Sequence, residues 1–209
     1  MFEVDALHYR DSLHLSYRKI DAPVTCVTGP SGSGKTTFLR MLNRLLLPDR
    51  GQIRYNGTDL NTLSPVQLRR EVVMLGQTPI LYEGNVRDNL QIGRMFSQKP
   101  PACETDLHAV LEAVSLSKGL DDACATLSGG ERQRLCLARV MLMDAQTYLL
   151  DEPSAALDKQ TEEQIIGAFV QFVRARQKQL IMITHSPQIA FAYAQGQLRI
   201  VNGQWEASA

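Results

Sequence analysis

The 209-residue sequence lacks several features that mark secreted, membrane-spanning or nucleic-acid-binding chains. Its four cysteines show no C-x-x-C spacing, and no charged, apolar and small-residue sequence marks a signal peptide at the N-terminus. No apolar run approaches the about 18 to 20 residues that a membrane span needs. Lys and Arg number 22 and balance 22 Asp and Glu, so no net charge draws the chain to nucleic acid or anionic lipid. We therefore expect a cytoplasmic protein with no nucleic-acid partner.

The composition that remains is typical of one globular domain. Hydrophobic residues make up 44% and charged residues 21%, so the chain can bury a sizeable core. No internal repeat and no long low-complexity tract is visible. Cys26 and Cys136 stand in apolar runs, where cysteine is most often a small core residue.

One stretch, residues 29–37, matches the phosphate-loop pattern G-x-x-x-x-G-K-[ST]. An apolar β-branched run precedes it and a helical pattern follows it, which is the context that this pattern requires. Glycines let successive backbone N–H groups point at one anion, and the helix N-terminus adds its positive end. Lys35 is then expected to reach the β- and γ-phosphates of a nucleotide, and the Thr36 hydroxyl to bind Mg²⁺. The predicted phosphate-binding residues are Gly29, Pro30, Ser31, Gly32, Ser33, Gly34, Lys35, Thr36 and Thr37.

Strands that alternate with helices predict an α/β fold with a mainly parallel sheet covered on both sides. Buried strands are expected at 24–28, 72–75, 147–150 and 180–184, and helices at 38–46, around 85–92 and at 104–116. Alternating residues at 2–6 and 13–17 predict an antiparallel patch beside the sheet. Residues 85–127 read as mainly helical, so we expect a helical subdomain inserted between two parts of the core, 1–84 and 128–209.

Polar residues follow the four predicted parallel strands, at the edge where such sheets bind ligands. Asp151 is expected to hold Mg²⁺, and Glu152 to orient or deprotonate the attacking water. A solvated strand end would give the same Asp-Glu pattern, and Gln77 or His185 alone is more often structural. The phosphate loop upstream favours the functional interpretation.

A second motif, residues 127–133 (LSGGERQ), opens another predicted helix. Ser128 and Glu131 fit a capping box, which by itself indicates only a helix start. Gly129 and Gly130 lower helix propensity but open the N–H groups to close approach by an anion. With this motif, the chain resembles the ATP-binding subunits of ABC transporters over essentially its whole length. The phosphate loop, the LSGGERQ signature, LLDEP at 149–153, SAALD at 154–158 and Thr-His at 184–185 come in the order of that family.

The resemblance implies a P-loop NTPase (RecA-like) core and a role for each matched residue. Tyr9 would stack on adenine, although its interval to Gly29 looks short. Gln77 would contact Mg²⁺ and the attacking water, and His185 would contact the γ-phosphate. Ser128, Gly129, Gly130 and Glu131 would close over ATP held by a partner chain, with Asp158 at the interface between the two sites.

The resemblance also implies partners. A homodimer would form head to tail around two ATP molecules with Mg²⁺, and would drive a separate membrane permease from the inner face of the membrane. The stretch 77–90 looks like an export-type pattern, whereas 121–126 lacks the motif of large multidrug exporters; small bacterial iron or metal exporters share this combination. The alternative is a soluble ABC-type ATPase acting on DNA or ribosomes, but no coiled coil separates the phosphate loop from the signature.

Overall fold

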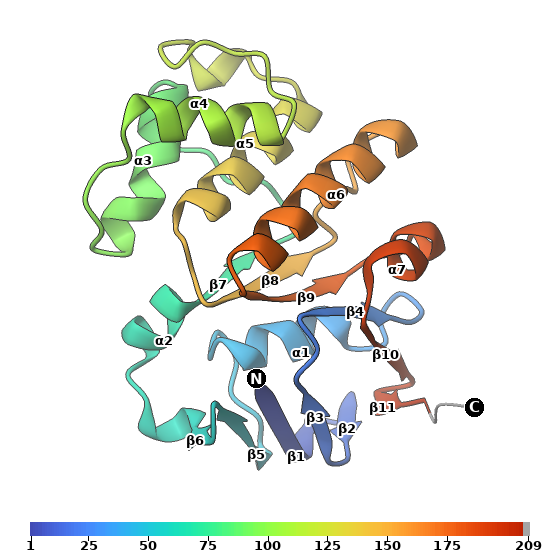
Figure 1. The fold of residues 1–209 in the computed structure, drawn as a ribbon. Coiled ribbons are helices and arrows are strands. Elements are labelled where there is room, and N and C mark those ends of the chain that lie inside the picture. The colour runs from blue at the N-terminus through green and yellow to red at the C-terminus, as the bar shows by residue number, and fades with distance from the viewer. Residues whose placement is uncertain (207–209) are drawn as a thin grey trace.

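The computed structural model describes residues 1–206, which form two β-sheets with helices between and around them (Figure 1). Five strands of the larger sheet are parallel, in the order β10-β4-β9-β8-β7, and β11 pairs antiparallel with β10 at one edge. The strands are β4 Val24–Thr28, β7 Val72–Leu75, β8 Thr147–Asp151, β9 Gln179–Ile183, β10 Gly196–Val201 and β11 Gln204–Trp205. Every residue of β8 and β9 is buried, which explains why both read as apolar runs.

The smaller sheet is antiparallel and has the order β2-β1-β5-β6, with β3 also paired to β1. Its strands are β1 Phe2–Tyr9, β2 Leu13–Leu15, β3 Arg18–Ile20, β5 Arg50–Tyr55 and β6 Thr58–Asp59. The predicted antiparallel patch and the mainly parallel sheet are therefore both confirmed.

Helix α1 (Lys35–Leu42) lies between the two sheets (Figure 1). Phe38 and Leu39 are fully buried in a core to which both sheets contribute, including Phe2 of β1 and Leu149 of β8. This packing fixes the helix that follows the phosphate loop against the larger sheet.

Helix α1 ends four residues earlier than predicted. Asn43 caps its C-terminus, and Arg44 adopts a left-handed backbone conformation with φ of +56°. The Asn43 side chain then accepts a hydrogen bond from the Leu45 amide at 3.3 Å, and Leu45 N also donates to Arg40 O. Apolar spacing alone predicted a continuous helix, because the side chain of Asn43 that stops it carries no periodic signal.

The opposite face of the larger sheet is covered by helices that share a second core with α3 and α4. The remaining helices are α2 Pro65–Glu71, α3 Val86–Phe96, α4 Glu104–Ala113, α5 Gly129–Leu142, α6 Lys159–Ala175 and α7 Pro187–Tyr193, with short 3₁₀ turns η1 Leu60–Thr62 and η2 Cys124–Thr126. Helix α3 is longer than predicted and α4 shorter. Ser64 occupies the N-cap of α2 with Pro65 as the first helical residue, but the Ser64 side chain makes no capping hydrogen bond.

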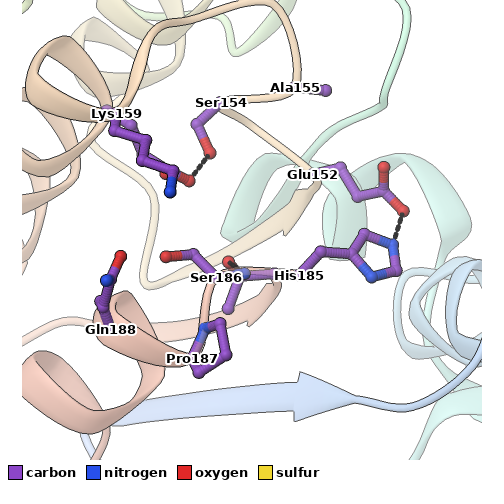
Figure 2. A pocket seen from close by; sticks show the side chains of 10 residues that line it. Glu152, Ser154, Ala155, Lys159, His185, Ser186, Pro187 and Gln188 are labelled. Atoms are coloured by element: carbon purple, nitrogen blue, oxygen red, sulfur yellow. Dashed lines mark hydrogen bonds and ion pairs between the residues drawn. The ribbon is translucent and has the colours of Figure 1, made fainter.

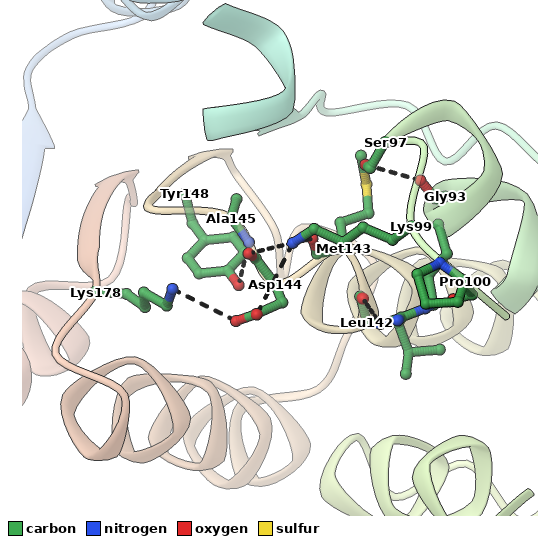
Figure 3. A network of polar contacts seen from close by, with 11 residues as sticks. Gly93, Ser97, Lys99, Pro100, Leu142, Met143, Asp144, Ala145, Tyr148 and Lys178 are labelled. Atoms are coloured by element: carbon green, nitrogen blue, oxygen red, sulfur yellow. Dashed lines mark hydrogen bonds and ion pairs between the residues drawn. The ribbon is translucent and has the colours of Figure 1, made fainter. Parts of the chain in front are cut away.

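Residues 85–127 contain α3, α4 and η2, and pack mainly against α5. Two cations bind the carbonyls at the C-terminus of α5 (Figure 3). One is in the last turn of α3 and the other follows that helix. Lys99 Nζ donates to the carbonyls of Met143 and Asp144, both at 2.8 Å, and an Arg94 guanidinium nitrogen donates to Leu142 O at 3.1 Å. Cations suit the carbonyl end of a helix. That this segment is a separate subdomain inserted into the core stays a prediction.

We predict that Leu149→Ala destabilises the protein by about 2 to 5 kcal/mol, because it leaves a cavity between β8 and α1. The free energy of unfolding from urea titration measures this. The control is Leu47→Ala, which truncates a leucine that is 54% exposed and should change stability by less than about 0.5 kcal/mol. Equal effects of the two substitutions would contradict the core assignment.

Candidate active site

Polar residues from four strands lie together at the carboxyl edge of the larger sheet. Gly29 follows β4, Gln77 lies two residues beyond β7, Asp151 ends β8 with Glu152 next to it, and His185 lies two residues beyond β9. Because β4, β9, β8 and β7 are adjacent and parallel, these ends share one edge. The sequence-predicted convergence is therefore present in the structure.

The phosphate loop connects β4 to α1 and requires glycine at two positions. Gly29 and Gly34 have φ of +140° and +99°, a region that favours glycine. A Cβ atom at Gly29 would lie 2.0 Å from the carbonyl oxygen of Ile200, and one at Gly34 would lie 2.6 Å from the Leu13 side chain. The backbone can therefore take this path only without side chains at these two residues.

Two polar groups of the loop are buried in ways that suit an anion. The Ser33 hydroxyl is buried and makes no hydrogen bond to any described residue. Lys35 is 6% exposed, and its ammonium donates to Gly29 O at 2.9 Å and Pro30 O at 2.7 Å. Burial lowers the pKa of Lys35, while the Glu152 and Asp151 carboxylates oppose that shift. A bound phosphate would supply the acceptor that the Ser33 hydroxyl lacks and a charged acceptor in place of the carbonyls that Lys35 now binds.

Thr36 and Asp151 form the link between the loop and strand β8. Thr36 Oγ1 donates to Asp151 Oδ1 at 3.0 Å, and the Asp151 side chain is almost fully buried. Burial raises the pKa of Asp151, and the hydrogen bond from Thr36 opposes this shift. The described residues contain no group of three or more His, Cys, Asp or Glu arranged for a metal. A Mg²⁺ ion here would therefore depend on oxygen from Thr36, Asp151 and Gln77, which are donors that Mg²⁺ accepts.

Glu152 lies at the centre of a hydrogen-bonded chain that includes Gln77 and His185, and Figure 2 shows its contact with His185. Its Oε2 accepts from Gln77 Nε2 at 3.0 Å, and its Oε1 lies 2.8 Å from His185 Nε2. The residue has φ of +50°, and its amide donates to Ile183 O at 3.2 Å. The carboxylate is 21% exposed, so it faces a partly open cavity rather than bulk water. Gln77 and His185, two of the residues predicted as catalytic, thus both contact the third, Glu152.

Tyr9 ends β1 and pairs across the antiparallel sheet with Leu13, the residue that lies over Gly34. The guanidinium of Arg10 lies 5.1 Å from the centre of the Tyr9 ring. The aromatic ring therefore belongs to the strand turn next to the phosphate loop, in a partly exposed position. Its stacking on adenine stays a proposal.

The signature forms a separate site. Ser128 caps α5, with both hydrogen bonds of the predicted capping box: Ser128 N donates to Glu131 Oε2 at 2.8 Å, and Glu131 N donates to Ser128 Oγ at 3.3 Å. A Cβ atom at Gly129 would meet nothing within 4 Å. Among the described residues, no hydrogen bond joins Ser128–Glu131 to the phosphate loop. The chain does not bring its own signature onto its own loop.

Asp158 follows both the signature and Glu152 in the sequence and caps α6. Its Oδ1 accepts from the Thr161 amide at 3.0 Å, and hydrogen bonds from the Thr161 side chain and amide lower the pKa of Asp158. Gly130 of the signature lies close to this loop. A Cβ atom at Gly130 would be in van der Waals contact with Ala156 O and the Leu157 side chain, both at 3.5 Å. The loop 154–158 therefore runs beside the start of the signature helix.

Two contacts near the site were not among the contacts that the sequence predicted. Gln133 is 1% exposed and donates through Nε2 to Pro153 O at 2.9 Å, which joins the signature helix to the residue after Glu152. Ser154 Oγ donates to Glu162 Oε1 at 2.5 Å across the cavity in Figure 2. A polar Gln133 at a position of the helix that faces the core was the one available signal for the first of these contacts.

A family model described as ABC transporter matches residues 15–155. The chain belongs to the ABC transporter family. Among curated ABC relatives, it is 36% identical over 188 residues to the phosphonates import ATP-binding protein PhnC 2 of Synechococcus sp. (strain JA-2-3B'a(2-13)), covering 84% of this chain and 70% of the relative. Three other curated relatives are matched over 13%, 49% and 65% of their own length, so the chain spans less than two thirds of each.

Two solved structures share the fold of this ABC domain. One is a bacterial Atm1-family ABC exporter with ATP bound, with a TM-score of 0.86, 25% identity and coverage of 99% of this chain and 38% of the exporter chain. The other is an ATP-binding cassette dimer in a post-hydrolysis state with ADP and Pi, with a TM-score of 0.85, 21% identity and coverage of 99% and 97%. The predicted P-loop NTPase fold is confirmed by these structures, and the family match makes the chain an ABC ATPase domain. In residues 1–206, no helix has the length and apolar character of a membrane span.

We predict that Asp151→Asn raises the stability of the nucleotide-free ABC ATPase at pH 7. Asn keeps an oxygen acceptor for Thr36 but removes a buried charge whose pKa is raised by burial. A raised pKa means that the ionised form costs stability above that pKa, so the difference between the variants should vanish as the pH falls below about 3.8. Urea midpoints at both pH values measure this, with Asp11→Asn in an exposed turn as control. A lower midpoint at pH 7 would refute the prediction.

Proposed function

We propose that this ABC ATPase works as a homodimer that closes head to tail around two ATP molecules and drives a separate membrane permease. The main support for this proposal is that the catalytic residues and the signature form two separate parts of one chain. Gln77 and His185 bind Glu152 next to the phosphate loop, whereas the signature at the start of α5 shares no hydrogen bond with that loop among the described residues. One chain therefore has both halves of a site but does not join them, and a second copy supplies the missing half.

Binding of ATP would use groups that lack phosphate partners in the free chain. Lys35 would exchange its contacts with the loop carbonyls for the β- and γ-phosphates, and the Ser33 hydroxyl would gain an acceptor. The Thr36 hydroxyl, Asp151 and Gln77 would hold Mg²⁺, and Tyr9 would stack on the base. When bound, Mg²⁺ would offset the charge that develops on the phosphate oxygens.

Hydrolysis would depend on the chain around Glu152. A water held by the Glu152 carboxylate would attack the γ-phosphorus as its proton moves to the carboxylate, and the bridging oxygen would leave with ADP. Gln77 would orient that water, and His185 would contact the γ-phosphate. The hydrogen bonds of Gln77 and His185 to the two carboxylate oxygens fix the side chain before substrate arrives, which lowers the cost of reaching the reactive geometry.

The signature of a second copy would complete the site. The amides of Gly129 and Gly130 stand at the first helical positions of α5, where no intrahelical carbonyl can accept from them. With the Ser128 hydroxyl they would bind the γ-phosphate held by the partner chain. Asp158 would lie where the two sites meet. ATP would thus hold the dimer together, and hydrolysis would release it.

We predict that Glu152→Gln leaves ATP binding intact, nearly abolishes hydrolysis and traps an ATP-bound dimer. Glutamine keeps the shape of the side chain but cannot take the proton from water. Phosphate release measures turnover, and sedimentation with and without ATP measures the dimer. Lys35→Ala is the matched control, since it should lose ATP affinity in calorimetry and form no dimer. Wild-type hydrolysis by Glu152→Gln, or a trapped species that stays monomeric, would overturn the proposal.

A groove beside Gln77 supports a membrane partner. Leu45, Gly76, Ile80 and Tyr82 line it together with Arg139, and its exposed apolar side chains include Leu45 at 50% and Ile80 at 66%. Clustered exposed apolar residues mark interaction sites on protein surfaces. A cytoplasmic segment of a permease seated here would contact the loop that carries Gln77, and so would sense the state of the nucleotide. The chain would then lie on the inner face of the membrane.

We predict that Leu45→Asp prevents co-purification of one integral membrane protein with the tagged chain from detergent-solubilised native membranes, because it places a charge in the groove. The same variant should still form the ATP-dependent dimer. Tyr17→Asp, which alters an apolar side chain of 60% exposure outside the groove, should retain the membrane protein. Loss with both variants, or with neither, would reject the groove as the docking site.

Export of iron or another metal stays a prediction. The similarities include an import ATP-binding protein as well as an Atm1-family exporter, so they favour neither direction of transport. No observation favours action on DNA or ribosomes.

A further inference from the structure

The signature helix carries a negative charge where the proposed function requires an anion site. Glu131 occupies the third helical position of α5, and its Oε2 accepts from Ser128 N at 2.8 Å. The carboxylate is therefore fixed in the first helical turn, beside the free amides of Gly129 and Gly130. Left uncompensated, it would cancel the positive helix end and repel a triphosphate.

Lys118 supplies the compensating charge. Its Nζ lies 3.2 Å from Glu131 Oε1, and the two side chains are only 28% and 21% exposed. The hydrogen bonds from Ser128 and Lys118 lower the pKa of Glu131 to about 2, so this carboxylate is ionised at physiological pH.

The position of Lys118 is fixed by the chain around it. Its amide donates to Leu116 O at 3.0 Å, and the next residue, Gly119, donates to Asp122 Oδ2 at 2.9 Å. The other cation at the start of α5, Arg132, donates to Leu127 O at 3.0 Å and is thus directed to the preceding turn. Lys118 is the cation that the structure directs at Glu131.

We propose that Lys118 is a positioning residue that neutralises Glu131, so that the signature of one chain can accept the triphosphate held by its partner. This inference rests on the proposed function, since it concerns the same head-to-tail dimer. Lys118 acts through Glu131 and the charge of the helix start. Its role is to set the ATP concentration at which two chains close.

The test is a charge series in the Glu152→Gln background, which prevents turnover. Sedimentation gives the ATP concentration for half-maximal dimer formation. Lys118→Met leaves the carboxylate uncompensated and should raise that concentration about tenfold, the size expected for one charge at a helix end. Glu131→Gln, whose amide oxygen still accepts from Ser128 N, should lower it below that of the parent, because the positive charge of Lys118 remains. The double variant should return within about twofold of the parent, and Lys118→Arg should match the parent.

If the Lys118–Glu131 pair has only a structural role and holds the loop of Lys118 against α5, the series gives a different result. Both single variants would then be impaired, and the double variant would be no better than Lys118→Met. The defect of Lys118→Met should also shrink as NaCl is raised, since salt screens repulsion but does not restore a lost contact. Its thermal midpoint should stay near that of the parent.

The two levels of the hypothesis fail separately. If the parent Glu152→Gln chain never dimerises with ATP, the proposed function is wrong. If the parent dimerises and Lys118→Met does so at the same ATP concentration, the role of Lys118 is wrong while the dimer stands. ATP binding to the monomer, measured by calorimetry, should be equal in all members of the series, because the signature acts on the nucleotide of the partner.

Discussion

The parallel pairing of β4, β9 and β8 is the constraint on which the rest of the site depends. β9 lies between the strand that leads into the phosphate loop and the strand that ends in Asp151, and all three pair in one register. The hydrogen bond from Thr36 to Asp151 then closes the gap across β9. A displacement of β9 along the sheet would separate the loop from the carboxylates, so the buried ladder determines the geometry of the chemistry.

Much of this arrangement could be predicted from the sequence, because buried parallel strands are short apolar runs and their polar ends must share an edge. The phosphate loop was recognisable because its glycines allow a backbone path that side chains would block. The signature was recognisable because its residues match the motif of the family in order. The end of α1 was not, since Asn43 stops the helix through a side-chain contact that periodicity does not encode. The contacts of Gln133 with Pro153 and of Lys118 with Glu131 could not be predicted either, because each joins segments that only the folded chain brings together.

The helical segment 85–127 contacts the signature helix near both of its ends. Lys118 pairs with the first turn of α5, and Lys99 binds the carbonyls after its last turn. Contacts of α5 with the catalytic edge are fewer, and the hydrogen bond from Gln133 to Pro153 O is one of them. The position of the signature is therefore tied to the helical segment more firmly than to the residues beside its own phosphate loop.

The left-handed backbone conformation of Glu152 affects which substitutions at this position would be favoured during evolution. A non-glycine residue at a φ of +50° costs roughly 1 to 2 kcal/mol relative to an ordinary conformation. Glycine or asparagine would fit this turn more comfortably. Substitution of Glu152 by glycine or asparagine would thus raise the stability of the fold and abolish turnover. Only selection for turnover opposes such a substitution. A duplicated copy released from that selection would be expected to lose its chemistry here first, while keeping its fold.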